Sequence, residues 1–82
     1  MSFHHDIRDL KVFKLPGRTF ATYLFILPEG RAWMVAGPKP RCVVWQGHLS
    51  PEQIHRIEQN AIPLPKLPPD LQRWSHPPKR AA

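Results

Sequence analysis

The sequence is poor in cysteine, acidic residues and long apolar runs, and these shortages exclude several classes of protein. Its 82 residues include one cysteine, so an internal disulfide cannot form and a disulfide-stapled secreted scaffold is excluded. The longest apolar run, Ala21–Leu27, is far shorter than the ~20 residues that a transmembrane helix requires. The first nine residues are polar and do not resemble a secretory signal. These features predict a small cytoplasmic protein without a membrane partner.

Groups that perform catalysis or bind metals are also scarce. The four glycines occur singly, so no glycine-rich phosphate loop is present. Glu29 and Glu52, expected in a turn and at a helix start, do not form a carboxylate pair for acid–base catalysis. Cys42, His48 and His55 are too widely spaced for a recognisable zinc site, and Cys42 is expected to be a small buried thiol in a strand. We therefore expect no enzymatic activity, no catalytic residues, no metal and no cofactor.

Positive charge dominates the composition and is unevenly distributed. Twelve Lys and Arg residues against six Asp and Glu residues give a formal net charge of +6 at pH 7. Six bases and one acid between Leu10 and Gly47 give +5, and four bases and one acid from Ala61 onward give +3. An excess of positive charge indicates which partners a protein attracts and how fast they associate with it, but it does not indicate the fold. An acidic partner is expected.

Turn residues divide the first half of the sequence into short strand-forming segments. Pro16 and Gly17 end the first segment, and the turn at Pro28, Glu29 and Gly30 joins the second and third into a β-hairpin. The second segment is apolar on both faces, which is typical of a central strand that is covered on both sides. The predicted strands, which form an antiparallel meander, are Leu10–Leu15, Thr19–Leu27, Arg31–Ala36 and Arg41–Gln46.

A single α-helix is predicted over Pro51–Asn60. Ser50 is a suitable N-cap, and Gln53 three residues later completes a capping box. Ile54 and Ile57 lie on the same side of this helix, so that it can cover one face of the sheet. The predicted fold class is therefore α+β: a small antiparallel β-meander of three to four strands capped by one C-terminal α-helix. The predicted core consists of Phe20, Leu24, Ile26, Trp33, Val35, Val44, Ile54 and Ile57.

An extended, proline-rich tail follows the helix. Six of the 11 prolines lie between Ala61 and Ala82, which favours polyproline II conformation. Within the tail, Pro69–Trp74 can form one helical turn. Its large apolar residues exceed what a solvated linker needs, so we expect the tail either to pack on the domain or to bind a partner. The predicted organisation is a polar N-terminal segment over residues 1–9, a single α+β domain over 10–62 and a basic tail over 63–82.

Binding is the function class that these exclusions leave. Bases and aromatic residues interleave on the strands, as in the pairs Arg31 with Trp33 and Arg41 with Trp45. On an exposed sheet of this kind, the Arg and Lys side chains can neutralise phosphates while nucleotide bases stack on the aromatic rings. The aromatic residues can equally form the core of the protein. We expect a non-enzymatic module that binds nucleic acid or a nucleoprotein assembly. The candidate binding residues are Lys11, Lys14, Arg18, Arg31, Lys39 and Arg41, with Leu71, Arg73, Trp74, Lys79 and Arg80 in the tail.

The alternative interpretation is a protein-binding adaptor or inhibitor, of the kind that phages or plasmids encode. It would use an exposed strand edge together with the Pro/Leu/Trp tail, and its bases would meet an acidic protein partner. Exposed bases contribute less than ~1 kcal/mol to folding, so charge reversal at Arg31 and Arg41 is expected to leave stability nearly unchanged. The sequence does not predict the oligomeric state.

Overall fold

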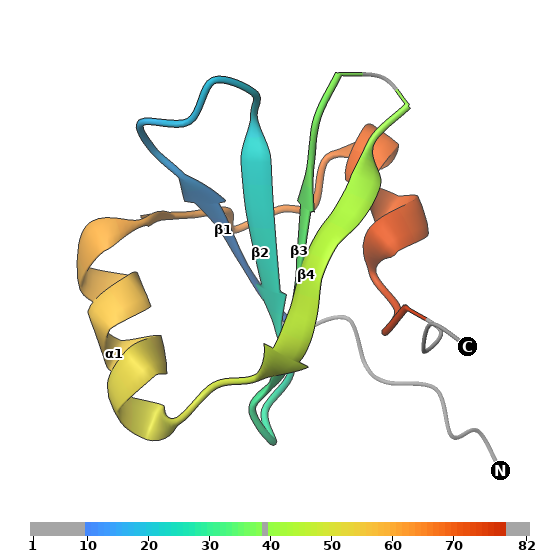
Figure 1. Cartoon of the computed structure of the whole chain (residues 1–82). Helices are drawn as coiled ribbons and strands as arrows, with labels where there is room; N and C mark the ends of the chain where they lie inside the picture. The colour runs from blue at the N-terminus through green and yellow to red at the C-terminus, as the bar shows by residue number, and fades with distance from the viewer. Residues whose placement is uncertain (1–9, 39, 79–82) are drawn as a thin grey trace, which may run out of the picture.

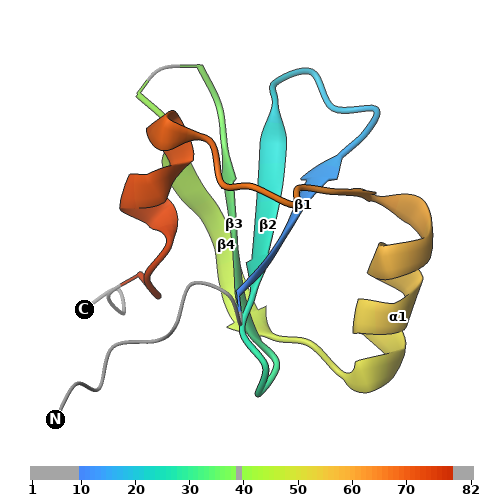
Figure 2. The same ribbon diagram turned by 180° about the vertical axis from the view of Figure 1, so that it is seen from behind.

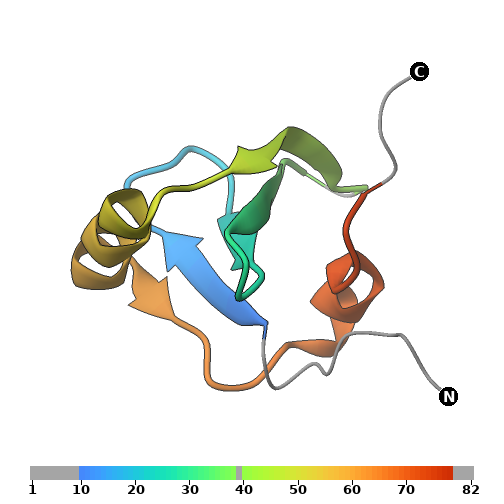
Figure 3. The same cartoon turned by 90° about the horizontal axis from the view of Figure 1, so that it is seen from below.

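A five-stranded antiparallel sheet lies between one α-helix and a proline-rich segment in the computed structural model (Figure 1). The proline-rich segment is the described part of the predicted tail, residues 63–78. The structure describes residues 10–38 and 40–78. Seen along the sheet in Figure 3, the α-helix and the proline-rich segment lie on opposite sides of the strands. The elements are β1 (Lys11–Leu15), β2 (Thr22–Ile26), β3 (Arg31–Ala36), β4 (Cys42–His48), α1 (Pro51–Asn60), β5 (Ile62–Pro63) and the 3₁₀ helix η2 (Pro69–Trp74).

The first four strands form the predicted meander, and their order in the sheet is β4-β3-β2-β1-β5. The β2–β3 hairpin is confirmed, with Tyr23 opposite Val35 and Phe25 opposite Trp33. Gly30 closes its turn with a φ of 100°, and a Cβ at this position would lie 2.9 Å from the carbonyl oxygen of Leu49. Only glycine meets both requirements without strain. The number of strands exceeds the prediction, because the two-residue β5 pairs with β1.

The segment after α1 passes around the β1 edge and reaches the other face of the sheet. Ile62 and Pro63 pair with β1, and the amide of Leu64 donates to the carbonyl oxygen of Val12 at 2.9 Å. Figure 2 shows the chain between α1 and η2 running from one side of the sheet to the other. The sheet is therefore covered on both faces, as the apolar sequence of β2 indicated.

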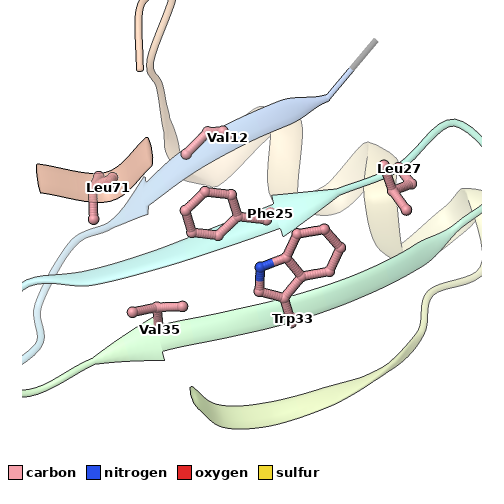
Figure 4. Close-up of a cluster of buried hydrophobic side chains, with 6 residues drawn as sticks. All are labelled: Val12, Phe25, Leu27, Trp33, Val35 and Leu71. Carbon is pink, nitrogen blue, oxygen red and sulfur yellow. The ribbon is translucent and has the colours of Figure 1, made fainter. Parts of the chain in front are cut away.

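The face covered by η2 holds the larger side chains of the core. Phe25 and Trp33 stack with their ring centroids 5.6 Å apart and their planes 4° from parallel. The indole Nε1 of Trp33 donates to the carbonyl oxygen of Trp74 at 2.8 Å, so this buried polar group is satisfied by the proline-rich segment. Figure 4 shows the side chains of this cluster, which consists of Val12, Phe25, Leu27, Trp33, Val35 and Leu71.

The face covered by α1 holds a second cluster, made of Phe13, Leu24, Ile26 and Ala32. Ile54 and Ile57 of α1 pack against it, yet both remain half-buried. The predicted capping box is present: the Ser50 hydroxyl accepts from the Gln53 amide at 3.2 Å, and the Ser50 amide donates to Gln53 Oε1 at 2.8 Å. The α1 bounds and its cap are thus confirmed.

Two predicted core residues are exposed, which corrects the expected core. Phe20 is 50% exposed because β2 begins only at Thr22, which leaves Phe20 in the connection from β1. Val44 is 54% exposed because the β3–β4 register shifts at this point: Val35 lies opposite Val43 and Met34 opposite Trp45. Val44 is therefore the extra residue of a β-bulge, in a strand at the edge of the sheet.

The proline-rich segment contributes to the core through Leu71, which is 1% exposed. Ser75 is also buried, and its hydroxyl donates to the carbonyl oxygen of Gln72 at 2.7 Å. Leu71 lies in η2, the 3₁₀ helix over Pro69–Trp74, which is the part of the tail for which a helical turn was predicted. The folded unit therefore continues beyond residue 62.

Candidate binding surface

Arg31 and Arg41 contact the protein's own C-terminal segment. The Arg41 guanidinium forms an ion pair with Asp70 and lies over the Tyr23 ring, 5.5 Å from its centroid. Its side chain is 15% exposed. Arg31 Nη2 donates to the carbonyl oxygen of Pro78 at 3.3 Å. Because Arg41 is packed, its charge reversal is expected to destabilise the fold, in contrast to the small effect predicted for an exposed base.

The other predicted bases that the structure describes are divided between the two faces of the sheet and the β1–β2 connection. Lys11 Nζ lies 2.9 Å from Glu58 Oε2 of α1, and this ion pair lowers the pKa of Glu58 through a hydrogen bond and through charge attraction. Lys14 is exposed and lies on the other face of the sheet from Lys11, because three residues separate the two along β1. This is the face covered by η2, where Lys14 lies opposite Tyr23. Arg18 is exposed in the β1–β2 connection. Lys39 lies outside the described residues.

The aromatic residues of the inner strands are not available for stacking on bases. Phe25 and Trp33 are completely buried, so the alternative that they form the core is the one observed. Both sheet faces are covered, by α1 and by η2. Phe20 and Trp45 remain partly exposed, but Phe20 lies in a connection and Trp45 on the outermost strand. An open sheet face for RNA, as the interleaved pattern suggested, is therefore absent from the part of the chain that the structure describes.

The predicted docking residues of the tail also differ in accessibility. Leu71 is buried in the core and cannot reach a partner without unfolding of η2. Trp74 is half-buried against the same cluster, and the exposed Arg73 places its guanidinium 5.2 Å from the Trp74 ring centroid. Lys79 and Arg80 lie outside the described residues.

The most accessible pairing surface is the outer edge of β4. Within residues 10–38 and 40–78, β3 is the only strand that pairs with β4, so the other side of this seven-residue strand is open. Val44 and Trp45 are the large apolar side chains exposed there, and Trp45 is 38% exposed. Cys42, expected to be buried, is exposed because it begins this edge strand. The sequence predicted the strand but could not identify it as an edge.

The opposite edge of the sheet is protected by its sequence. β5 has two residues, Ile62 and Pro63, and proline has no amide hydrogen to donate. β4 has neither a proline nor a Lys, Arg, Asp or Glu side chain. Short length, proline, charge and β-bulges are the features that usually limit strand pairing at an edge. β4 lacks the first three, and its only such feature is the bulge at Val44, which leaves the remaining residues of the strand available for pairing.

No protein-family model matches the sequence, and no curated protein or solved structure matches it either. Within the described residues, no three His, Cys, Asp or Glu side chains come together in a way that could hold a metal ion. The helices in this part of the chain are also too short or too polar to cross a membrane. Function therefore has to be inferred from the surface that the chain presents.

Proposed function

We propose that this protein is a non-enzymatic protein-binding module that pairs the outer edge of β4 with an extended segment of a partner. The observation that carries this proposal is the open β4 edge, which is seven residues long, has no proline, Lys, Arg, Asp or Glu, and is apolar at Val44 and Trp45. In strand addition, backbone hydrogen bonds supply affinity and alternate side chains supply specificity. Here the two exposed apolar residues are the side chains that a partner would cover.

The charge of the protein favours an acidic partner for this edge. The net charge of +6 attracts a negatively charged protein over long range and speeds its association, while the uncharged β4 places no charge inside the interface. Charge then contributes mainly to the encounter, and pairing along β4 contributes mainly to the lifetime of the complex. Of the two functions predicted from the sequence, this is the protein-binding adaptor. In this proposal the tail stabilises the fold instead of binding the partner.

A matched pair of lysine variants tests the role of β4. Val44→Lys places a charge on the open edge, whereas Ile62→Lys places the same charge at a residue that is 52% exposed on the opposite edge. Each protein is immobilised, and the proteins captured from a native lysate are quantified. We expect a set of proteins to be retained by the natural chain and by Ile62→Lys, and reduced at least about tenfold by Val44→Lys.

Identical capture by all three proteins would contradict the β4 proposal. Light scattering of the purified chain separates two kinds of strand pairing. A dimer that Val44→Lys dissociates would identify a second copy of the chain as the occupant of the edge. A monomer would leave the edge to a different protein.

We also propose nucleic-acid binding as a second candidate function, because several exposed bases have no carboxylate partner. These bases, which form no ion pair within the described residues, are Lys14, Arg18, Arg56, Lys66 and Arg73. They are distributed over the surface, which favours contacts to phosphates without sequence specificity. The binding of a labelled oligonucleotide should then fall steeply between about 50 and 200 mM salt and should be unaffected by Val44→Lys. Binding that is insensitive to salt would contradict this candidate.

A further inference from the structure

A groove lies between α1 and the start of the β1–β2 connection, where the helix covers the sheet incompletely. Its volume is about 450 Å³. Leu15, Leu49 and Ile57 line it, and all three are half-buried side chains that pack against the core cluster beneath α1. The groove therefore offers an apolar surface that is continuous with the core yet open to a ligand. None of its described lining residues belongs to β4.

The polar residues that border the groove make it positive. Arg18 from the β1–β2 connection and Arg56 from α1 both line it, both are exposed, and neither forms an ion pair with any described residue. No Asp or Glu is among its described lining residues. Both acidic residues of α1, Glu52 and Glu58, lie outside the lining of the groove, and Glu58 is already paired with Lys11. An apolar ligand that carries negative charge thus meets attraction and no opposing carboxylate.

The shape of the groove favours a peptide segment over a small molecule. Small-molecule sites usually enclose most of their ligand, whereas no residue lining this groove is fully buried. Gln53, Arg56 and Asn60 follow one another along the groove side of α1, and the seven steps from Gln53 to Asn60 advance about 10 Å along the helix axis. That length corresponds to about three residues of an extended peptide.

From this geometry we infer that the groove between α1 and the β1–β2 connection binds a short acidic segment of a partner protein, with one or two apolar side chains seated between Arg18 and Arg56. The apolar anchors rest on Leu15, Leu49 and Ile57, and flanking Asp or Glu residues pair with the two guanidinium groups. This surface is separate from β4, so either one can be occupied without the other.

Peptide titration of the isotope-labelled 82-residue chain tests this site. The probe is a hexapeptide, acetyl-Asp-Asp-Leu-Leu-Asp-Asp-amide, and amide chemical shifts report where it binds. Two comparison peptides replace every aspartate with lysine or every leucine with alanine. We expect the largest shifts at Arg18, Gln53 and Arg56 with the probe, and weaker binding of both comparison peptides.

Charge variants supply the matched controls. Arg18→Glu and Arg56→Glu should each raise the Kd of the probe about fivefold, and the double variant about twenty-five-fold. Arg73→Glu makes the same change of charge in η2, on the opposite side of the sheet, and should leave the Kd nearly unchanged. Arg56→Gln should weaken binding in the same direction as Arg56→Glu but by less, and it avoids adding a third carboxylate to α1.

Several results would overturn the site. They are equal binding of the lysine peptide, an equal effect of Arg73→Glu, and absence of shifts in the groove at millimolar probe. Stronger groove shifts with a six-nucleotide oligothymidine than with the probe would also overturn it, because they would assign the two arginines to phosphate binding. Val44→Lys should bind the probe as the natural chain does, so failure of the β4 proposal and failure of the groove are distinguishable.

Discussion

The two faces of the sheet are covered in opposite ways. One is covered by α1, a helix with a complete capping box, yet no residue of α1 is fully buried. The other is covered by a proline-rich segment with little regular structure, yet this segment buries Leu71 and Ser75 and provides the acceptor for the Trp33 indole. Regular local structure and contribution to the core are thus separate properties in this protein.

A difference in how the two segments lose entropy accounts for this contrast. A short helix is marginal by itself and depends on its cap and its apolar stripe, which here reaches the sheet through half-buried isoleucines. A proline-rich chain has restricted φ angles before folding, so ordering it costs less conformational entropy. One well-placed leucine and a few hydrogen bonds can then hold it in position.

The largest expected effect tests whether the proline-rich segment contributes more to the free energy of unfolding than α1 does. Leu71→Ala should lower the free energy of unfolding by about 2–5 kcal/mol, because it leaves a cavity beside Phe25 and Val35. Leu49→Ala makes the same change at a half-buried leucine on the α1 side and should cost less than about 2 kcal/mol. Urea unfolding measures both. A larger effect at Leu49 would reverse the comparison.

An intermediate effect is expected from the helix cap. Ser50→Ala removes the acceptor for the Gln53 amide and should lower the free energy of unfolding by about 1 kcal/mol. Ser50→Asp, which restores a capping oxygen, should retain most of the stability. The indole N–H resonance of Trp33, which donates to the Trp74 carbonyl oxygen, should keep its chemical shift in both variants, because α1 and η2 lie on opposite faces. A shifted Trp33 resonance in Ser50→Ala would mean that the packing of α1 and that of η2 are coupled.

The smallest effect concerns the Lys11–Glu58 ion pair that links α1 to β1. Because Lys11 holds the pKa of Glu58 below its ordinary value, the pair stabilises the fold above the unfolded pKa of Glu58. This contribution is lost as the pH falls through the lower, folded pKa. An NMR titration of the Glu58 carboxyl should show that its pKa returns toward the ordinary value in Lys11→Met. An unchanged pKa would show that the exposed pair does not persist in solution.

Features specified within a few residues were predictable from the sequence. The β2–β3 hairpin follows from a turn that needs Gly30, and the start of α1 follows from Ser50 and Gln53. The exposure of Phe20 and Val44 was not predictable, because alternation of apolar residues does not reveal where a strand starts or where a bulge interrupts its register. The candidate site was predictable in part: an open strand edge was one hypothesis, but periodicity does not tell which strand is outermost.

By itself the sequence determined the turns, the capped helix, the strand segments and the excess of positive charge, since each depends on neighbouring residues or on composition. The tertiary structure alone decided which of the candidate binding side chains pack within the fold and which remain exposed. Arg41 pairs with Asp70 across 29 positions, and Trp33 donates to Trp74 across 41. No local pattern encodes contacts over such separations, because they depend on the path by which the last segment crosses the sheet. That path buries Leu71, packs Arg41 against Asp70 and leaves β4 as the open edge.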